Sequence, residues 1–197
     1  MYVSLHKFTP ELIEVARQAF PAWYVADLQA SAQNFHWSLI GRFVVSTYIH
    51  KETGVWHDIP TGMYRLEDIF YFSYAHTDEY VMVAIDDKKV WIDMEIEKPR
   101  DNSLLHKYHT ELEHISRTDW HSFYTMRTAK ESLVKYLDLT FDVIEDMTLL
   151  EVHDFDLVYN DIHFNKKIVI IFRGQSYSVI HGEKDDMNYA ISNEYTG

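Results

Sequence analysis

The sequence contains no cysteine, which excludes disulfides, thiolate metal ligands and cysteine nucleophiles and agrees with a cytoplasmic protein. It is also short of positive charge: 18 Lys and Arg stand against 31 Asp and Glu, a formal net charge of −13. Nucleic-acid backbones are bound by clustered Lys and Arg, so this balance argues against a nucleic-acid partner. No apolar run is long enough to cross a membrane, and residues 1–10 do not read as a secretory signal.

What the sequence does contain is enough apolar material for a core. The chain has 197 residues, of which 47% are hydrophobic and 15% aromatic. This composition excludes disorder of the whole chain and fits one larger domain or two small lobes. Twelve histidines make the net charge sensitive to pH near neutrality.

The most informative stretch spans residues 80–97. Two apolar runs flank a polar break at residues 86–89, and the second run alternates strictly between apolar and polar residues. Alternation of this kind is typical of a half-buried strand, and the two runs together predict a β-hairpin. Side chains two apart along a strand point the same way, so Asp93 and Glu95 present two carboxylates on one face. Like charges this close repel each other unless a cation lies between them, and a hard divalent cation favours oxygen ligands; the alternative is the solvated face of an edge strand.

Helices are predicted elsewhere along the chain. Thr9-Pro10-Glu11 begins a short helix, because it places a capping hydroxyl, a first-turn proline and an acid in succession. Apolar residues at helical spacing predict a longer helix over residues 23–49. Gly41 falls within it and costs about 1 kcal/mol relative to Ala, so we expect close packing there. Further helices are predicted over residues 104–113 and 122–137.

The predicted strands complete the fold class. They cover residues 69–74, 168–172, 177–181 and 187–191, with 168–172 and 177–181 forming a second hairpin. Residues 143–155 and 157–164 are predicted to form short strands or turns. The order is helices, hairpin, helices, hairpin, which predicts an α+β fold of two similar lobes. We expect these lobes to span residues 1–98 and 99–197, with the loop at 99–103 as their boundary.

A charged stripe is predicted on the helix over residues 122–137. Arg127, Glu131 and Lys135 are spaced four apart, so they lie on one face of that helix. The alternative to a functional role is a solvent-exposed ladder of ion pairs, which contributes little to stability.

Several of these segments together resemble a known family. They read Phe72-Ser73-Tyr74-Ala75-His76-Thr77, Trp91-Ile92-Asp93-Met94-Glu95, and a helix ending Lys130-Glu131-Ser132-Leu133-Val134-Lys135. In this order they resemble the motifs F-x-x-S-H-[ST], G-[IV]-D-[IV]-E and W-[ST]-x-K-E-[AS]-x-x-K of the 4′-phosphopantetheinyl transferase superfamily, in its larger, surfactin-synthetase-activating type. Residues 107–113 are similar to R-F-F-S-x-x-E of that family, and residues 36–41 to R-x-L-L-G. The resemblance covers about residues 33–150.

The resemblance implies a fold and a reaction. The fold is a pseudo-twofold pair of α+β lobes, with coenzyme A and Mg²⁺ in the cleft between them. The reaction moves the phosphopantetheine arm of coenzyme A onto a serine of an acyl or peptidyl carrier protein and releases 3′,5′-ADP. The family's larger members are usually monomers, so the resemblance also implies a monomer.

The resemblance further implies roles for individual residues. It assigns Asp93, Glu95 and Glu131 to the metal ion, and catalytic roles to Glu131, Lys135 and Glu113. Lys135 lies one turn beyond Glu131 and would neutralise charge on the leaving diphosphate. Glu131, through water, or Glu113 would be the base for the carrier serine. The alternatives are that Lys135 is a surface residue paired to Glu131 and that Glu113 caps or salt-bridges a helix.

A second set of residues is implied to bind the coenzyme. It consists of His76, Thr77, Lys130, Lys135 and Arg42, with His76 donating to a phosphate oxygen. Without the resemblance, the residues around His76 favour a histidine that satisfies a turn over one that binds a ligand.

The sequence also departs from the family pattern. The departures are Trp37 for a basic residue, Met63 for the lysine of G-K-P, Ala75 for serine, Trp91 for glycine, Arg127 for tryptophan, and Asp138 and Thr140 for two glycines. Two of these, Trp37 and Met63, remove positive charge that the family directs at the coenzyme's phosphates, and Arg42, Arg65 and Arg127 are the possible replacements. The negative net charge also disfavours an acidic carrier protein. The sequence therefore leaves three hypotheses: an active divergent transferase, a non-catalytic relative that acts as a binding or scaffold protein, and an unrelated acidic α+β binding domain.

Overall fold

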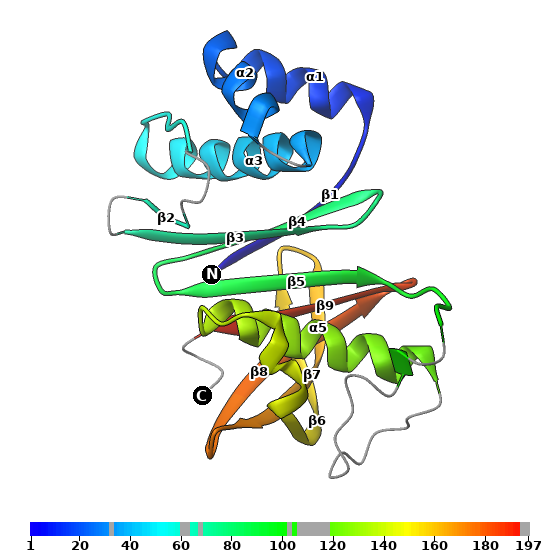
Figure 1. Cartoon of the computed structure of the whole chain (residues 1–197). Helices are drawn as coiled ribbons and strands as arrows, with labels where there is room; N and C mark the ends of the chain where they lie inside the picture. Colours follow the sequence, from blue (N-terminus) through cyan, green and yellow to red (C-terminus); the bar gives the residue numbers. More distant parts are fainter. Residues whose placement is uncertain (32–33, 60–63, 67–68, 102–103, 106–118, 194–197) are drawn as a thin grey trace.

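The computed structural model describes residues 1–31, 34–59, 64–66, 69–101, 104–105 and 119–193. Two antiparallel sheets lie face to face in the middle of the molecule, with helices on the outer side of each (Figure 1). The α+β class predicted from the sequence is therefore confirmed. Among the described residues, no helix combines the length and the apolarity needed to cross a bilayer.

The first sheet carries helix α3 (Phe35–Thr53) on its outer face, and α1 (Pro10–Ala19) and α2 (Ala22–Ser31) pack on α3 (Figure 1). The strand order of this sheet is β1-β4-β3-β2, with β1 at Tyr2–Lys7, β2 at Arg65–Leu66, β3 at Phe70–His76 and β4 at Tyr80–Asp86. α3 packs Ile40, Val45 and Ile49 against Phe72 and Val83 of the sheet, and this buried cluster holds the helix in place.

The N-terminal helices follow the sequence signals only in part. The Thr9 hydroxyl accepts a hydrogen bond from the backbone N–H of Leu12 at 3.2 Å, so the predicted cap of α1 is confirmed. The single helix predicted over residues 23–49 is wrong, because α2 ends at Ser31 and α3 begins at Phe35. Asn34 stands at the N-cap of α3 with non-helical backbone angles, a position that asparagine favours over a helix interior.

Gly41 lies where α3 crosses β3. A Cβ atom at this position would lie 2.8 Å from the ring of Tyr74. Any larger residue would therefore push the helix away from the sheet. The close packing predicted at this mid-helix glycine is confirmed.

The hairpin predicted over residues 80–97 is wrong in its pairing, although both strands exist. β4 pairs with β1 on one edge and β3 on the other, so it has no free edge for the next strand. β5 (Val90–Ile96) instead pairs with β9 in the second sheet. The carboxylate of Asp86 accepts hydrogen bonds from the backbone N–H groups of Asp87 and Lys88, at 2.8 and 3.4 Å, and so shapes the turn.

The chain thus passes from the first sheet to the second at residues 87–89. The boundary predicted between residues 98 and 99 stays a prediction, but the hydrogen bonding places β5 with the C-terminal strands.

The second sheet is built almost entirely from the C-terminal half. Its order is β5-β9-β8-β7-β6, with β6 at Thr148–Tyr159, β7 at Ile162–Phe172, β8 at Gln175–Lys184 and β9 at Met187–Asn193. Helix α5 (Trp120–Tyr136) covers its outer face, and a 3₁₀ helix, η1 (Phe141–Asp146), follows. The helix predicted over residues 122–137 and the strand over 187–191 are confirmed. Of the segment predicted as short strands or turns over 143–155, residues 143–146 lie in η1 and residues 148–155 in β6.

The second predicted hairpin is also confirmed, since β7 pairs with β8 around a turn at residues 173–174. Of the helix predicted over residues 104–113, only 104–105 lie within the described residues, and both are helical.

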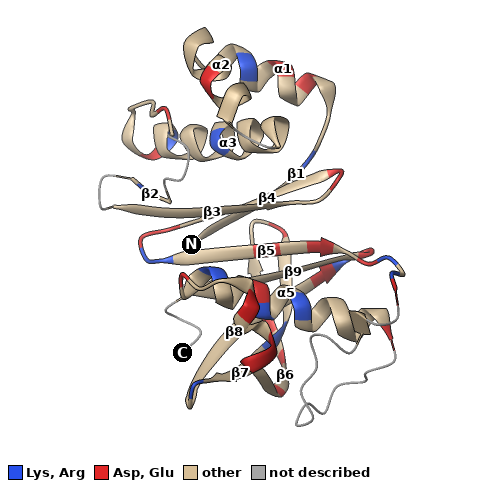
Figure 2. Ribbon diagram, viewed as in Figure 1, with Lys and Arg blue, Asp and Glu red and all other residues tan. Residues whose placement is uncertain are grey.

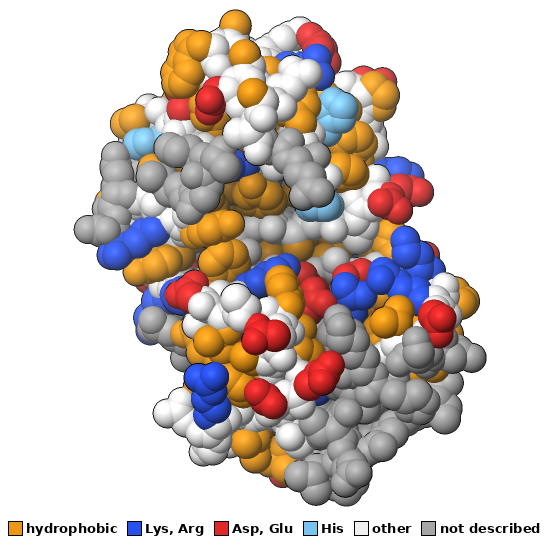
Figure 3. Space-filling model, in the orientation of Figure 1, with side chains coloured by type: hydrophobic (Ala, Val, Ile, Leu, Met, Phe, Trp, Pro, Cys, Tyr) orange, Lys and Arg blue, Asp and Glu red, His pale blue; other side chains and the backbone are white. Residues whose placement is uncertain are grey.

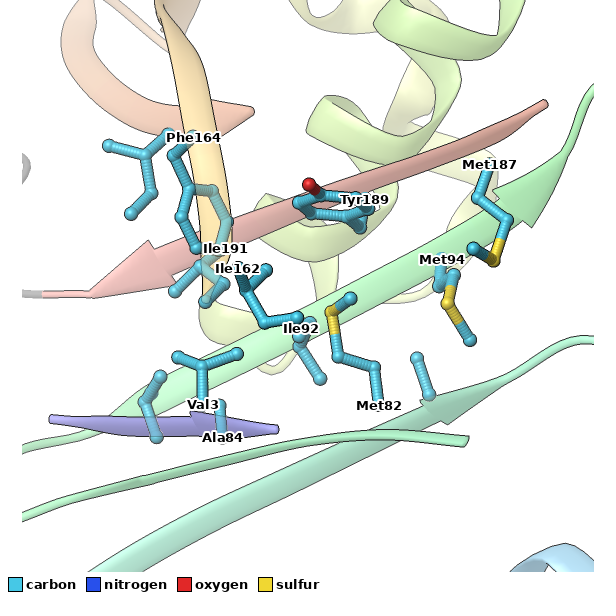
Figure 4. Close-up of a cluster of buried hydrophobic side chains, with 13 residues drawn as sticks. Val3, Met82, Ala84, Ile92, Met94, Ile162, Phe164, Met187, Tyr189 and Ile191 are labelled. Carbon is cyan, nitrogen blue, oxygen red and sulfur yellow. The ribbon is translucent and has the colours of Figure 1, made fainter. Parts of the chain in front are cut away.

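An apolar cluster joins the two sheets (Figure 4). Val3, Met82 and Ala84 of the first sheet pack against Ile92 and other residues of the second. The Ser73 hydroxyl also accepts a hydrogen bond from the backbone N–H of Ile92 at 3.2 Å, which ties β3 to β5. Because the apolar side chains of β5 face the first sheet, its alternate residues face α5.

Candidate functional site

Three carboxylates meet where β5 lies against α5. Asp93 and Glu95 come from β5 and Glu131 from α5, and one potential ligand atom of each lies within 4.8 Å of those of the others. The three acids that the resemblance assigns to one metal ion therefore lie close together. Asp93 and Glu95 do not come from the first sheet, because β5 belongs to the second sheet, which α5 covers. All three acids therefore come from the same layer of the molecule.

Basic side chains already neutralise these acids. Lys135 Nζ lies 2.5 Å from Asp93 Oδ1, while Arg127 contacts Glu95 Oε1 at 2.8 Å and Glu131 Oε1 at 2.7 Å. Figure 2 shows the acidic and basic positions of β5 and α5 side by side. The predicted stripe on α5 therefore exists, but it faces β5. Its lysine pairs with Asp93, and among the described ion pairs none joins it to Glu131.

A further basic residue reaches the cluster from the chain beyond β5. Arg100 Nη2 lies 3.5 Å from the second carboxylate oxygen of Glu95. Three acids thus face three bases, Arg100, Arg127 and Lys135. We call these six residues the charged cluster.

Burial and charge change the acidity of the cluster. Burial, followed by the charge of Asp93, raises the pKa of Glu131 to about 7, although Arg127 opposes this shift. Burial also raises the pKa of Glu95, with Arg127 again opposing it. For Lys135, burial acts to lower the pKa, but the charge and hydrogen bond of Asp93 outweigh it, so the pKa is raised.

One carboxylate oxygen in the cluster has no protein partner. Oδ2 of Asp93 is buried and accepts no hydrogen bond from the described residues, and the residue as a whole is 5% exposed. A buried carboxylate oxygen without a partner destabilises the fold, because it loses its hydrogen bonds to water and no protein hydrogen bond replaces them. Together with two neighbouring carboxylates it offers the all-oxygen ligand set that Mg²⁺ favours.

A pocket of about 200 Å³ opens beside the charged cluster. Its lining residues are His76, Thr77, Asp78, Met94, Glu95, Ile96, Lys98 and Arg100. It thus lies between the end of β3 in the first sheet and the end of β5 in the second. Figure 3 shows Lys and Arg side chains gathered next to acidic ones near the junction of the two layers. Glu95 and Arg100 belong to both the pocket and the cluster.

His76 is held by aromatic and polar neighbours. Its ring stacks on Trp37, with centroids 4.8 Å apart and an interplanar angle of 17°, and its Nε2 lies 3.4 Å from Asn34 Nδ2. Burial, assisted by the charge of Lys135, lowers the pKa of His76. Thr77 uses its hydroxyl to accept hydrogen bonds from the backbone N–H groups that follow it, and so shapes the turn before β4.

Two of the predicted coenzyme-binding residues lie elsewhere. Arg42 is 4% exposed and donates to the carbonyl oxygens of Ser38 and Ile59 and to the Tyr74 hydroxyl. Its guanidinium therefore fixes α3 to neighbouring segments and does not line the pocket. Lys130 is fully buried in α5 and is also absent from the pocket lining. Glu113 lies outside the described residues.

Sequence reasoning missed Lys98 and Arg100 in the pocket and the bridging role of Arg127. A signal for the first pair was present, since Lys98 and Arg100 follow shortly after the acids Glu95 and Glu97. Arg127 was identified as a departure from a motif and as part of a stripe, but helix spacing alone does not reveal which strand that stripe faces.

Comparison with known proteins adds no assignment. Neither the models of known protein families nor the curated proteins include a match to this sequence.

Proposed function

We propose that this protein is a divalent-cation-dependent transferase of the 4′-phosphopantetheinyl type. The observation that carries the proposal is the meeting of Asp93, Glu95 and Glu131 beside a pocket with basic lining residues. The buried, unpartnered Oδ2 of Asp93 supports it independently, because it provides an oxygen for a ligand that the protein does not supply.

The three carboxylates would hold Mg²⁺, and this ion would supply charge neutralisation to the oxygens of a bound diphosphate. In the pocket, Lys98 and Arg100 provide positive charge for the same diphosphate, and His76 provides a ring nitrogen. Lys98 and Arg100 would replace the positive charge that the sequence lost at Trp37 and Met63.

The transfer itself balances as a displacement at phosphorus. The carrier serine oxygen forms a bond to the phosphorus that bears the pantetheine arm, and the bond from that phosphorus to the bridging oxygen breaks. The leaving group is 3′,5′-ADP, and the serine proton passes to a carboxylate. Glu131, through water, and Glu113 are the candidate bases. Lys135, held by Asp93, would stabilise charge on the leaving diphosphate.

The same proposal includes a fold, binding partners, an oligomeric state and a cellular location. Each half of the molecule places a long helix, α3 or α5, on the outer face of an antiparallel sheet, which supports a pseudo-twofold pair of lobes. Coenzyme A as donor, an acyl or peptidyl carrier protein as acceptor, a monomeric state and a cytoplasmic location all stay predictions.

A second candidate function is that of a non-catalytic binding or scaffold protein with the same fold. It is favoured by Arg127, which already occupies two of the three acids, and by Arg42, which is committed to structural contacts. In that case the acids stabilise the packing of α5 on β5 and need no metal ion.

Calorimetric titration with coenzyme A in the presence of Mg²⁺ separates the two. The transferase proposal expects binding, and it expects mass spectrometry to show phosphopantetheine added to an apo carrier protein. Glu131→Gln is expected to abolish transfer without unfolding the protein. Glu145→Gln, at an exposed acid of η1, is the matched control and is expected to leave transfer intact. Absence of coenzyme binding at high micromolar concentrations would exclude the transferase, and an Asp93→Ala variant that keeps its cellular function would favour the scaffold.

A further inference from the structure

Arg127 joins two of the three clustered carboxylates. Its Nη2 lies 2.8 Å from Glu95 Oε1 and its Nε lies 2.7 Å from Glu131 Oε1. The side chain is 17% exposed, so solvent screens these contacts only weakly. A guanidinium that donates to two carboxylates neutralises and bridges them, as a divalent cation would.

We propose that Arg127 is a competing counter-ion of the cation site. It holds Glu95 and Glu131 when no divalent cation is bound, and it must release them before a cation binds at full affinity. This inference rests on the cation site of the proposed function, but it concerns the affinity of that site and not the transfer reaction.

The distribution of partners among the carboxylate oxygens supports the competition. Lys135 takes one oxygen of Asp93, and Arg127 and Arg100 take the two oxygens of Glu95. Oδ2 of Asp93 is buried and accepts no hydrogen bond from the described residues. At this oxygen, the basic side chains of the cluster leave a ligand position open. An arriving cation therefore finds one oxygen ready and must take the others from basic side chains.

The charge balance supports it as well. With all six groups ionised, three negative charges face three positive ones, so the cluster offers little net attraction to a divalent ion. An anionic diphosphate in the pocket would attract Arg100, which lines the pocket and also pairs with Glu95. Binding of the anion and the cation are then expected to favour each other.

The test is a titration of the purified full chain with Mn²⁺, in which electron paramagnetic resonance measures the free ion. Arg127→Met keeps the length and helix propensity of the side chain and removes the charge. We expect it to bind Mn²⁺ at least about tenfold more tightly than the wild type, a change within the range of coupling between two binding events in one protein. Adding Asp93→Asn to Arg127→Met is expected to abolish this gain.

A second variant guards against a folding failure. Arg127→Lys keeps the charge but cannot donate to both carboxylates from a planar fork, so it is expected to give a smaller gain in affinity. Circular dichroism checks that each variant is folded. The proposal is overturned if both variants bind Mn²⁺ no more tightly than the wild type, if no form binds it, or if Asp93→Asn leaves the gain unchanged. If Arg127→Met binds Mn²⁺ more tightly but the wild-type protein transfers nothing to a carrier protein, the proposed transferase function is wrong. The proposal that Arg127 competes with the cation then still holds.

Discussion

Lys135 donates to Asp93 across the junction of α5 and β5, with Nζ and Oδ1 2.5 Å apart. Asp93 is 5% exposed, and its other oxygen has no partner among the described residues. Among the described residues, Lys135 is therefore the side chain that holds this buried acid by a hydrogen bond and an ion pair. Packing of the helix on the strand and the chemistry of the candidate site depend on the same contact.

Replacement of Lys135 by Met is expected to destabilise the protein. It leaves the buried carboxylate of Asp93 without a hydrogen bond, and a hydrogen bond to a charged group contributes about 1.5–3 kcal/mol. Because the lysine side chain is 30% exposed, we expect a loss near the lower end, about 1–2 kcal/mol in the free energy of unfolding. Urea denaturation in the presence of a chelator measures it.

The control is Lys7→Met. Lys7 pairs with Glu79 at 3.7 Å, and both side chains are 62% exposed, so its removal is expected to change stability by less than about 0.5 kcal/mol. If the two variants lose the same free energy of unfolding, the contact of Lys135 with Asp93 stabilises the protein no more than an exposed ion pair does.

Gly41→Ala is expected to destabilise the protein, although Ala is the better helix former by about 1 kcal/mol. The new Cβ would lie 2.8 Å from the Tyr74 ring, and such overpacking costs about 1–3 kcal/mol. Thermal unfolding followed by circular dichroism measures the change. In a Tyr74→Ala background the clash is absent, and there the same substitution is expected to be neutral or stabilising. A stabilised single variant would contradict the close packing of α3 on β3.

The parts of the fold that the sequence predicted are those set by local pattern. The alternation over residues 90–97 gave β5 and the side on which its acids lie, and the capping signal at Thr9 gave the start of α1. The pairing of β5 was wrong because a short polar break is compatible with a hairpin and equally with a crossing between sheets. The decisive fact, that β1 and β3 occupy both edges of β4, involves residues far apart in the sequence.

The candidate site shows the same limit. Helix spacing placed Arg127, Glu131 and Lys135 on one face, and strand spacing did the same for Asp93 and Glu95. Which face meets which depends on the packing of α5 against β5, and so the partners in each ion pair could not be assigned from spacing. The structural role of Arg42 was missed for a similar reason, since its acceptors lie on three separate segments.

Acid is expected to destabilise the protein through His181, a fully buried residue of β8. Burial, with the nearby charges of Lys166 on β7 and His121 on α5, lowers the pKa of His181 from 6.5 to about 3, while Glu183 Oε1 lies 3.8 Å from its Nδ1. The folded protein therefore holds this histidine neutral, whereas the unfolded chain protonates it below pH 6.5. Stability is full above that pH and falls by about 1.4 kcal/mol per pH unit as the pH decreases toward 3.

Urea denaturation between pH 7 and pH 5 measures this slope. His181→Met removes the titrating group, and the fall in stability should become shallower by the amount expected for one histidine. His163→Met, at a histidine whose side chain is 54% exposed, is the control and should preserve the slope. An unchanged slope in His181→Met would show that other groups dominate the acid response.

The final prediction concerns the state of His76 in the pocket. Burial lowers the pKa of this histidine, and the Trp37 ring that stacks on it at 4.8 Å provides part of that burial. Trp37→Ala exposes the imidazole, so its pKa is expected to rise toward 6.5, as an NMR titration of the ring protons would show. Trp23→Ala, at a tryptophan that is 66% exposed, should leave the pKa unchanged.

A pKa of His76 that does not respond to Trp37→Ala would assign the shift to the charge of Lys135 instead, and Lys135→Met should then raise it. The distinction matters for the pocket. A histidine kept neutral by Trp37 offers a phosphate only a hydrogen bond, so the positive charge for a diphosphate must come from Lys98 and Arg100. Neutralising those two residues is then expected to weaken coenzyme binding more than His76→Gln does, as titration calorimetry of the three variants would measure.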